Sequence, residues 1–219
     1  MKIQVVQDLV CPWCRIGHHN LEQALATWSN GIDTPVTIEW LPYQLDPLAE
    51  GAPKEDFRER FTQRKGVPEA RMNQMFDQVT QAGASLGLIF NFDRITVAVD
   101  TLPGHVAIAA TPQAKQPAMV AALHTAYFED GQDIGETDVI VAYAAKAGLD
   151  AVEIEPVRAA LASPIARAEQ RETVRQVQEA GITGVPYFVF DGKVALSGGQ
   201  PVPAFLQALE QASEPALAR

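Results

Sequence analysis

Apolar residues follow two periodicities along this chain, one typical of strands and one typical of helices. Four short runs rich in β-branched and aromatic residues predict strands, at residues 3–10, 36–41, 184–190 and 193–196. The last two are separated by Asp191-Gly192, a strong hairpin signal. From residue 54 to about residue 180, apolar residues recur every three or four positions, which predicts helices almost throughout.

Local signals set the ends of several predicted helices. The first helix should follow the first strand and run through Trp28 to a turn at Asn30-Gly31, and the last should span Pro203 to Ala212. In the helical stretch, we expect Thr137 to be an N-cap and Gly148 to end the same helix.

The order of these elements predicts an α/β fold class in which both ends of the chain build one mixed central sheet. The N-terminal elements form a βαβ unit, expected to be parallel and right-handed, and the C-terminal elements form a ββα unit. We predict a discontinuous domain made of residues 1–50 and 181–219, and an inserted helical domain made of residues 51–180.

Composition and charge narrow the class of partner. The chain has 219 residues and a net charge of −10, which argues against nucleic acid as a partner. No apolar run is long enough for a membrane span, and Met1-Lys2 is not followed by a signal-peptide pattern. We therefore expect a cytoplasmic protein with no membrane partner, and the oligomeric state stays open.

The first strand is followed directly by Cys11 and Cys14, the only cysteines, with Pro12 and Trp13 between them. A CxxC motif that ends a strand and opens a helix indicates thiol–disulfide chemistry. The N–H groups and macrodipole at a helix N-terminus favour negative charge, so Cys11 should be the exposed, nucleophilic thiolate. Cys14 lies one turn further, on the helix face that should pack on the sheet, and would be the sheltered, resolving thiol.

Other roles for the cysteine pair remain open at this point. A single disulfide is a poor stabilising framework for a chain this long. A structural zinc site needs four ligands, and no second CxxC is present, although His18 or His19 could add one ligand. The thiols could also be inert core residues, which Pro12 and the strand–helix junction disfavour. We expect redox chemistry and no metal ion.

A second constellation is Val185-Pro186, directly before a strongly predicted strand. Proline cannot donate a hydrogen bond to a strand ladder, and in a tight turn its peptide bond can be cis. The residues alone also allow a trans proline that begins an edge strand.

Taken together, the strand–CxxC–helix unit and the Gly-Val-Pro segment before a hairpin and a terminal helix resemble the thioredoxin superfamily. The inserted helices resemble its DsbA branch, and within that branch the chain resembles the cytoplasmic FrnE-like group. Four segments carry the resemblance: residues 8–14 (DLVCPWC), 100–105 (DTLPGH), 126–135 (AYFEDGQDIG) and 181–190 (GITGVPYFVF).

This resemblance implies a thioredoxin-like fold with a large helical insertion and a redox-active disulfide between Cys11 and Cys14. It implies that Pro186 is cis and lies beside the cysteines, and that the Val185 backbone holds the substrate as an added strand. The expected activity is that of a protein disulfide oxidoreductase, and the reductase or isomerase direction stays undetermined.

The resemblance also sets expectations for substrates. Pro12 and Trp13 should contact the substrate, with Trp13 exposed at the mouth of the site. They replace the Pro-His pair of DsbA, which implies a weaker oxidant. The expected partners are protein, peptide or small-molecule thiols and disulfides, with glutathione as a candidate co-substrate and no tightly bound cofactor.

Supporting roles are assigned to a few further residues. Asp8 is a candidate for proton transfer at Cys14, with a loop or cap role as its alternative. We expect His18 to be partly buried and hydrogen-bonded to a carbonyl, with a catalytic role as the alternative, and His105 to be structural. Gly198-Gly199-Gln200 is expected to be a turn and only weakly a phosphate- or glutathione-binding loop.

Two functions of other classes compete with disulfide exchange. One is a glutathione-dependent isomerase or transferase, related to 2-hydroxychromene-2-carboxylate isomerase and kappa-class glutathione transferase. Those families typically have serine at the catalytic position, so the two intact cysteines argue against it. The other is a redox-sensing or chaperone-like binding protein without catalytic turnover.

Overall fold

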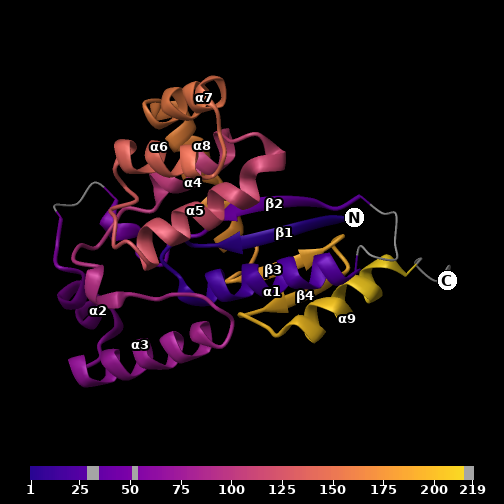
Figure 1. Cartoon of the computed structure of the whole chain (residues 1–219), viewed down its shortest axis with the longest axis horizontal. Coiled ribbons are helices and arrows are strands. Elements are labelled where there is room, and N and C mark those ends of the chain that lie inside the picture. The colour runs from indigo at the N-terminus through magenta and orange to yellow at the C-terminus, as the bar shows by residue number, and fades with distance from the viewer. Residues whose placement is uncertain (29–34, 51–53, 215–219) are drawn as a thin grey trace.

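A four-stranded mixed sheet forms the centre of the computed structural model, which describes residues 1–28, 35–50 and 54–214 (Figure 1). Its strands, in the spatial order β2-β1-β3-β4, are β1 (Lys2–Gln7), β2 (Thr37–Pro42), β3 (Tyr187–Phe190) and β4 (Val194–Ser197). β2 runs parallel to β1, and β3 runs antiparallel to both β1 and β4. The predicted mixed sheet built from both chain ends is therefore confirmed.

The C-terminal hairpin forms at the predicted turn. Asp191 and Gly192 have φ angles of +50° and +67°, the left-handed conformation that a type I′ turn requires at its two central positions, and the Lys193 N–H donates to the Phe190 carbonyl at 2.9 Å. The predicted turn at Asn30-Gly31 lies outside the described residues.

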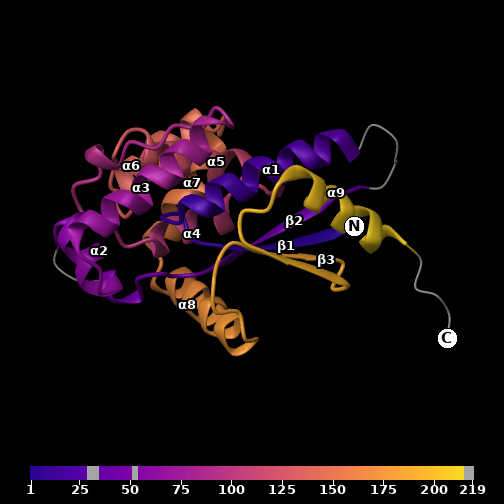
Figure 2. The ribbon, with the colours of Figure 1, turned by 90° about the horizontal axis from the view of Figure 1, so that it is seen from below.

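One face of the sheet is covered by α1 (Pro12–Trp28) and α9 (Val202–Ser213), which pack against each other (Figure 2). The two helices and the sheet enclose a hydrophobic cluster whose largest members are Ile3, Leu21, Trp28, Phe188, Phe190, Phe205 and Leu209. The helix face of α1 that the sequence assigned to the sheet, including Cys14 and Leu21, is buried as predicted. α8 lies on the side of the sheet away from α1, where it contacts β2.

The middle of the chain is helical. Its α-helices are α2 (Phe57–Lys65), α3 (Glu69–Ala84), α4 (Leu102–Ala110), α5 (Gln116–Phe128), α6 (Thr137–Lys146), α7 (Ala151–Leu161) and α8 (Pro164–Glu179). Short 3-10 turns occur at Pro47–Ala49, Phe92–Arg94 and Gln113–Lys115. These helices have a hydrophobic cluster of their own, which also takes in Leu9 and Ile16 from either side of the cysteine motif. The CxxC motif therefore lies where the sheet and the inserted helices meet.

Two expectations for the helical stretch were wrong. Residues 85–101 form no α-helix, because Gly87 leaves α3 with a φ of +75° and Leu88, Phe90 and Phe92 then turn inward at two-residue spacing. Thr137 is the first residue of α6 and not its cap; Glu136 stands in the N-cap position, without a side-chain hydrogen bond.

The end predicted for the same helix is confirmed. Gly148 has a φ of +86°, and the N–H groups of Gly148 and Leu149 donate to the carbonyls of Ala145 and Ala144. This is the Schellman arrangement that glycine favours after a helix.

Within the described ranges, no helix combines the length and apolar character needed to cross a bilayer.

Gly131 lies tightly against the backbone of Arg94 within the inserted helical stretch. Its φ is +65°, and an added Cβ would lie 2.3 Å from the Arg94 carbonyl oxygen. Gly131→Ala should lower the free energy of unfolding by roughly 2–5 kcal/mol, from backbone strain together with the clash. Gly66 is the matched control, because it has a φ of +63° and open space around it. Gly66→Ala should cost only about 1 kcal/mol, and equal losses in urea denaturation of both variants would contradict this account.

Candidate active site

The connection between β1 and α1 fixes the position of Cys11. The Cys11 N–H donates to the Asp8 carbonyl at 3.0 Å, and the Cys14 N–H donates to the Cys11 carbonyl at 3.0 Å. Cys11 therefore stands directly before the first residue of α1, Pro12, which needs no partner for an N–H. The positive end of the helix macrodipole faces this position and favours a negatively charged sulfur there.

Both thiols are free, and both are largely covered. Cys14 is fully buried, as predicted, but Cys11 is only 5% exposed, so the expectation that Cys11 is exposed was wrong. The inserted helices, which the sequence could not place, form the opposite wall of a cavity onto which Cys11 opens. Access to Cys11 is therefore through this cavity and not from an open surface.

The environment of Cys14 disfavours its thiolate. Burial raises the pKa of the Cys14 thiol well above its usual value, and the hydrogen bond and charge of Cys11 raise it further. A hydrogen bond from the Asp8 backbone offsets part of this rise. Cys14 can thus become nucleophilic only when a proton acceptor removes its proton.

The segment before β3 lies against the cysteines. The Val185–Pro186 peptide bond is cis, and the Cys11 Sγ–H donates to the Val185 carbonyl at 3.6 Å. Helix α1 approaches closely at Gly17, where an added Cβ would lie 3.2 Å from Pro186 Cγ. Residues almost the whole chain apart in sequence therefore meet at one thiol.

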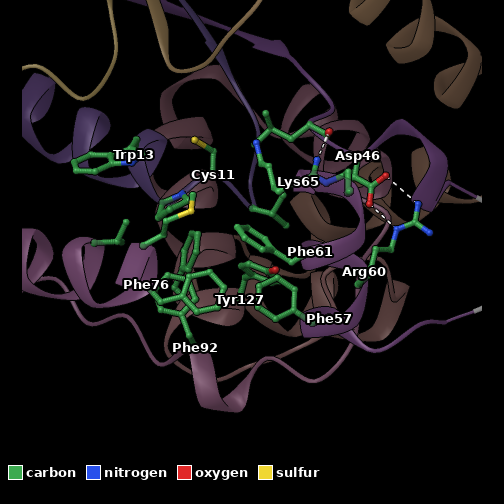
Figure 3. Close-up of a pocket in the computed structure, with 18 of the residues that line it drawn as sticks. Cys11, Trp13, Asp46, Phe57, Arg60, Phe61, Lys65, Phe76, Phe92 and Tyr127 are labelled. Atoms are coloured by element: carbon green, nitrogen blue, oxygen red, sulfur yellow. Dashed lines mark hydrogen bonds and ion pairs between the residues drawn. The ribbon is translucent and has the colours of Figure 1, made fainter. Parts of the chain in front are cut away.

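The cavity beside Cys11 has a volume of about 300 Å³. Figure 3 shows Cys11 and Trp13 on one side, a group of aromatic side chains below them, and the Asp46–Arg60 ion pair at the far end. The aromatic lining comes mainly from Phe57, Phe61, Phe76, Phe92, Tyr127 and Phe128. Trp13, Pro12 and Val185 also line the cavity, and Trp13 is 43% exposed at its mouth, as predicted.

Behind the cysteines lies a buried acid. Asp8 is fully buried; its Oδ2 accepts a hydrogen bond from the Leu45 N–H at 2.6 Å, and its Oδ1 lies 3.8 Å from His105 Nε2. His105, expected to be only structural, thus faces the carboxylate that the sequence singled out. Asp8 follows β1 and His105 lies in α4, far away in the sequence. No local sequence pattern could therefore have predicted that they lie close together.

A model of the DSBA-like thioredoxin domain matches residues 2–210 of this chain. The chain belongs to that family. It is also 27% identical to the uncharacterized protein YwbO of Bacillus subtilis over 213 residues, which cover 94% of each chain. This agrees with the resemblance to the DsbA branch that the sequence motifs carried.

Solved structures of similar fold include two DsbA-type proteins. The probable DsbA oxidoreductase SCO1869 of Streptomyces coelicolor is 29% identical, with a TM-score of 0.84 over 100% of this chain and 93% of that one. The cytosolic disulfide reductase DsbM of Pseudomonas aeruginosa, in a structure with glutathione, is 21% identical, with a TM-score of 0.68 over 96% and 98% of the two chains. The DsbA-like fold with a helical insertion is thereby established for this chain.

In this DsbA-like chain, the aromatic wall of the cavity is the part of the site that sequence reasoning missed. In the sequence, Phe57, Phe61, Met75 and Phe76 are apolar residues at helical spacing, a pattern that by itself indicates only core packing. One signal could have distinguished α2: it is strongly polar apart from these aromatic residues, and none of its residues is fully buried. When large aromatic rings on a helix are only partly buried, the rest of their surface can line a cavity.

His18 does not take part in the cavity beside Cys11. Its ring packs against Trp40, His124 and Phe188, with ring centroids 4.7, 5.2 and 6.5 Å away. Neither ring nitrogen has a hydrogen-bond partner among the described residues, so the expected bond to a carbonyl was wrong. Burial lowers the pKa of His18 to about 3, which keeps the ring neutral beside the apolar core.

The glycine-rich turn before α9 has a structural contact with α1. The Asn20 side-chain amide donates to the Gln200 carbonyl at 2.9 Å, and Asn20 is buried.

Within the described ranges, no three His, Cys, Asp or Glu side chains are grouped so as to hold a metal ion.

The buried histidines predict how stability depends on pH. Burial also lowers the pKa of His124 well below its usual value, with a smaller contribution from the nearby His18. Below about pH 6.5 each of these rings is protonated when the chain is unfolded but neutral when it is folded, so stability should fall as the pH falls from there towards 3. Each such histidine adds about 1.4 kcal/mol per pH unit to the slope.

His18→Leu tests this origin of the slope. Urea denaturation between pH 6.5 and pH 4 should give a shallower loss of stability for this variant than for the wild type, by about one proton. His19→Gln, on the neighbouring, partly exposed residue, is the control and should keep the wild-type slope. An unchanged slope in His18→Leu would show that the ring is not held neutral by the fold.

Proposed function

We propose that this DsbA-like protein is a thiol–disulfide oxidoreductase in which Cys11 attacks and Cys14 resolves. The observation that carries the proposal is the contrast between two thiols one helical turn apart: Cys11 opens onto a cavity, whereas Cys14 is fully buried behind it. A nucleophile needs access to substrate, and a resolving thiol needs access only to the first sulfur.

The reaction exchanges sulfur–sulfur bonds in two steps. The Cys11 thiolate attacks a substrate disulfide R–S–S–R′, forms a Cys11–S–R bond and releases R′S⁻, which takes up a proton. Deprotonated Cys14 then attacks Cys11 Sγ, forms the Cys11–Cys14 disulfide and releases the second thiol. The substrate disulfide gains two electrons and the protein dithiol loses two, and the reverse sequence oxidises a substrate dithiol.

The segment beside the cysteines supports a mode of substrate binding. Val185 and Pro186 stand beside Cys11, and we propose that a substrate backbone pairs with Val185 as a short added strand. Pro12 and Trp13 would flank the same chain from the other side. The Val185 carbonyl accepts the Cys11 Sγ–H bond and would exchange this partner for one from the substrate.

We also propose that the protein acts in the cytoplasm as a FrnE-like disulfide reductase or isomerase. The presence of glutathione in a structure of the fold-related DsbM supports glutathione as the thiol that returns the Cys11–Cys14 disulfide to the dithiol. In a compartment rich in glutathione, the pair would be kept largely reduced.

Cys11→Ser should abolish disulfide reduction, because the serine hydroxyl is not nucleophilic at neutral pH. The loss is measured in a turbidity assay, where insulin should precipitate no faster with the variant than with dithiothreitol alone. Cys14→Ser should instead stop after the first step and accumulate a mixed disulfide on Cys11, detected by mass spectrometry.

The same two variants separate the competing functions. Full activity of Cys11→Ser would refute the proposal. An isomerase or transferase would bind glutathione tightly and be indifferent to Cys14→Ser. A redox-sensing binding protein would release its client on oxidation but reduce insulin no faster than dithiothreitol alone.

We further propose that Asp8 accepts the proton of Cys14. Its carboxylate is buried, it adds to the raised pKa of the Cys14 thiol, and its backbone contacts that thiol. His105 faces the other side of the carboxylate and would position it. Such a group lowers the barrier to proton removal in a place that water does not reach.

Asp8→Asn keeps the shape of the side chain and its acceptor for the Leu45 N–H. The resolving step should slow by about a hundredfold, measured as decay of the mixed disulfide in rapid-quench mass spectrometry. The defect should shrink as the pH rises, because Cys14 then loses its proton to hydroxide. A purely structural role would instead slow Cys11 alkylation and the resolving step alike, with no rescue at high pH.

A further inference from the structure

The cavity beside Cys11 is built as a stack of aromatic rings. Phe76 stacks on Phe92 with ring centroids 4.1 Å apart, and Phe57 and Phe61 flank Phe76 at 5.7 and 5.1 Å. α2 contributes Phe57 and Phe61 although none of its residues is fully buried. The two rings keep part of their surface towards the cavity, where a planar group can stack on them.

Positive charge lies along the same wall. α2 also contributes Arg60, Arg64 and Lys65 to the lining of the cavity. Arg60 is neutralised by ion pairs with Asp46 and Glu55. Arg64 donates to the Leu45 carbonyl, and in the described part of the chain neither Arg64 nor Lys65 forms an ion pair with a carboxylate. In a protein of net charge −10, this leaves local positive charge beside an aromatic cavity.

The size of the cavity and the burial of Cys11 limit what can reach the Cys11 sulfur. Its volume of about 300 Å³ lies at the lower end of the range for small-molecule sites. Cys11 is only 5% exposed, so a disulfide on the surface of a folded protein would have to enter the cavity. A small molecule, with one half inside the cavity and the sulfur at Cys11, meets no such obstacle.

We propose that the cavity between α1, α2 and α3 is a specificity pocket for low-molecular-weight disulfides in which the half that enters is an aromatic group bearing a carboxylate. The ring stacks on Phe61 beside the edge of Phe76, and the carboxylate lies towards Lys65 and Arg64. This inference rests on the proposed disulfide exchange at Cys11 and adds the substrate class. The reduced protein gives two electrons to the substrate and forms the Cys11–Cys14 disulfide, and two thiols leave.

Four symmetric disulfides can test the aromatic wall and the positive charge of this pocket separately. They are para-dithiodibenzoate, its diamide, dithiodipropionate and its diamide, which combine an aromatic or aliphatic body with a charged or neutral end. Pre-reduced protein is mixed with each, quenched with an alkylating agent, and its oxidised fraction followed by mass spectrometry. Each rate constant is divided by that of dithiothreitol with the same disulfide, because aromatic thiols are intrinsically better leaving groups.

The normalised rate constant should be highest for the aromatic dicarboxylate. We expect it to exceed that of the aliphatic dicarboxylate by about tenfold or more, the scale on which apolar pockets discriminate. The aromatic diamide should fall between them, about threefold below the aromatic dicarboxylate, and this gap should narrow with added salt.

Variants assign each preference to its residues. Phe61→Ala removes one ring and Met75→Trp fills the cavity from α3; both should erase most of the aromatic preference. Lys65→Gln should weaken the preference for the carboxylate, because only Arg64 then remains, and should leave the aromatic preference in place. The controls are Ile89→Ala, on a side chain that is 53% exposed outside the cavity, and Arg71→Gln, on an exposed arginine of α3 outside it. Both should behave as wild type.

The outcomes that overturn this inference differ from those that overturn the proposed function. Equal normalised rates with all four disulfides would refute the pocket while leaving disulfide exchange intact. An aromatic preference that survives in a folded Met75→Trp protein would place the substrate elsewhere and refute the inference too. A reduced protein that reacts with none of the four disulfides, nor with insulin, would refute the proposed function itself.

Discussion

The site depends on one packing constraint, the burial of the strand–helix junction between two hydrophobic clusters. Leu9 and Ile16 belong to the cluster of the inserted helices, whereas Val5 before them and Leu21 after them belong to the cluster of the sheet. The junction therefore cannot move without disturbing both. Because Cys11 lies within it, the helix dipole, the Val185 carbonyl and the cavity wall are all held at fixed positions relative to one sulfur.

The same burial creates a layer of polar groups that the fold keeps away from water. Asp8, His18, His105 and His124 are all buried close to α1, and several of their ring or carboxylate atoms have no partner among the described residues. Leaving such groups unpaired costs free energy, and burial lowers the pKa of His18 and of His124, so these two rings stay neutral. The burial of His18 and His124 should therefore lower the stability of the fold in acid.

The inserted helices have two physical roles that the same side chains share. The rings of Phe76 and Phe92 help to close the core of the insertion, and they also form the wall opposite Cys11. A core residue at the edge of a cavity contributes to stability on one side and to recognition on the other. Under the proposed function, these helices would make the entrance selective without any change in the cysteine motif.

The local sequence determined much of this protein. Periodicity, the Asp191-Gly192 turn and the strand–CxxC–helix unit depend on near neighbours, so the strands, most helices and the identity of the two thiols could be predicted. Helix was predicted through residues 85–101, where none of the α-helices forms. Phe90 and Phe92 pack into the core with residues distant in sequence, and this packing determines the local backbone more than helix preference does. Only the tertiary structure decided the burial of Cys11, the position of His105 next to the Asp8 carboxylate and the aromatic wall, because each arises where segments far apart in sequence pack together.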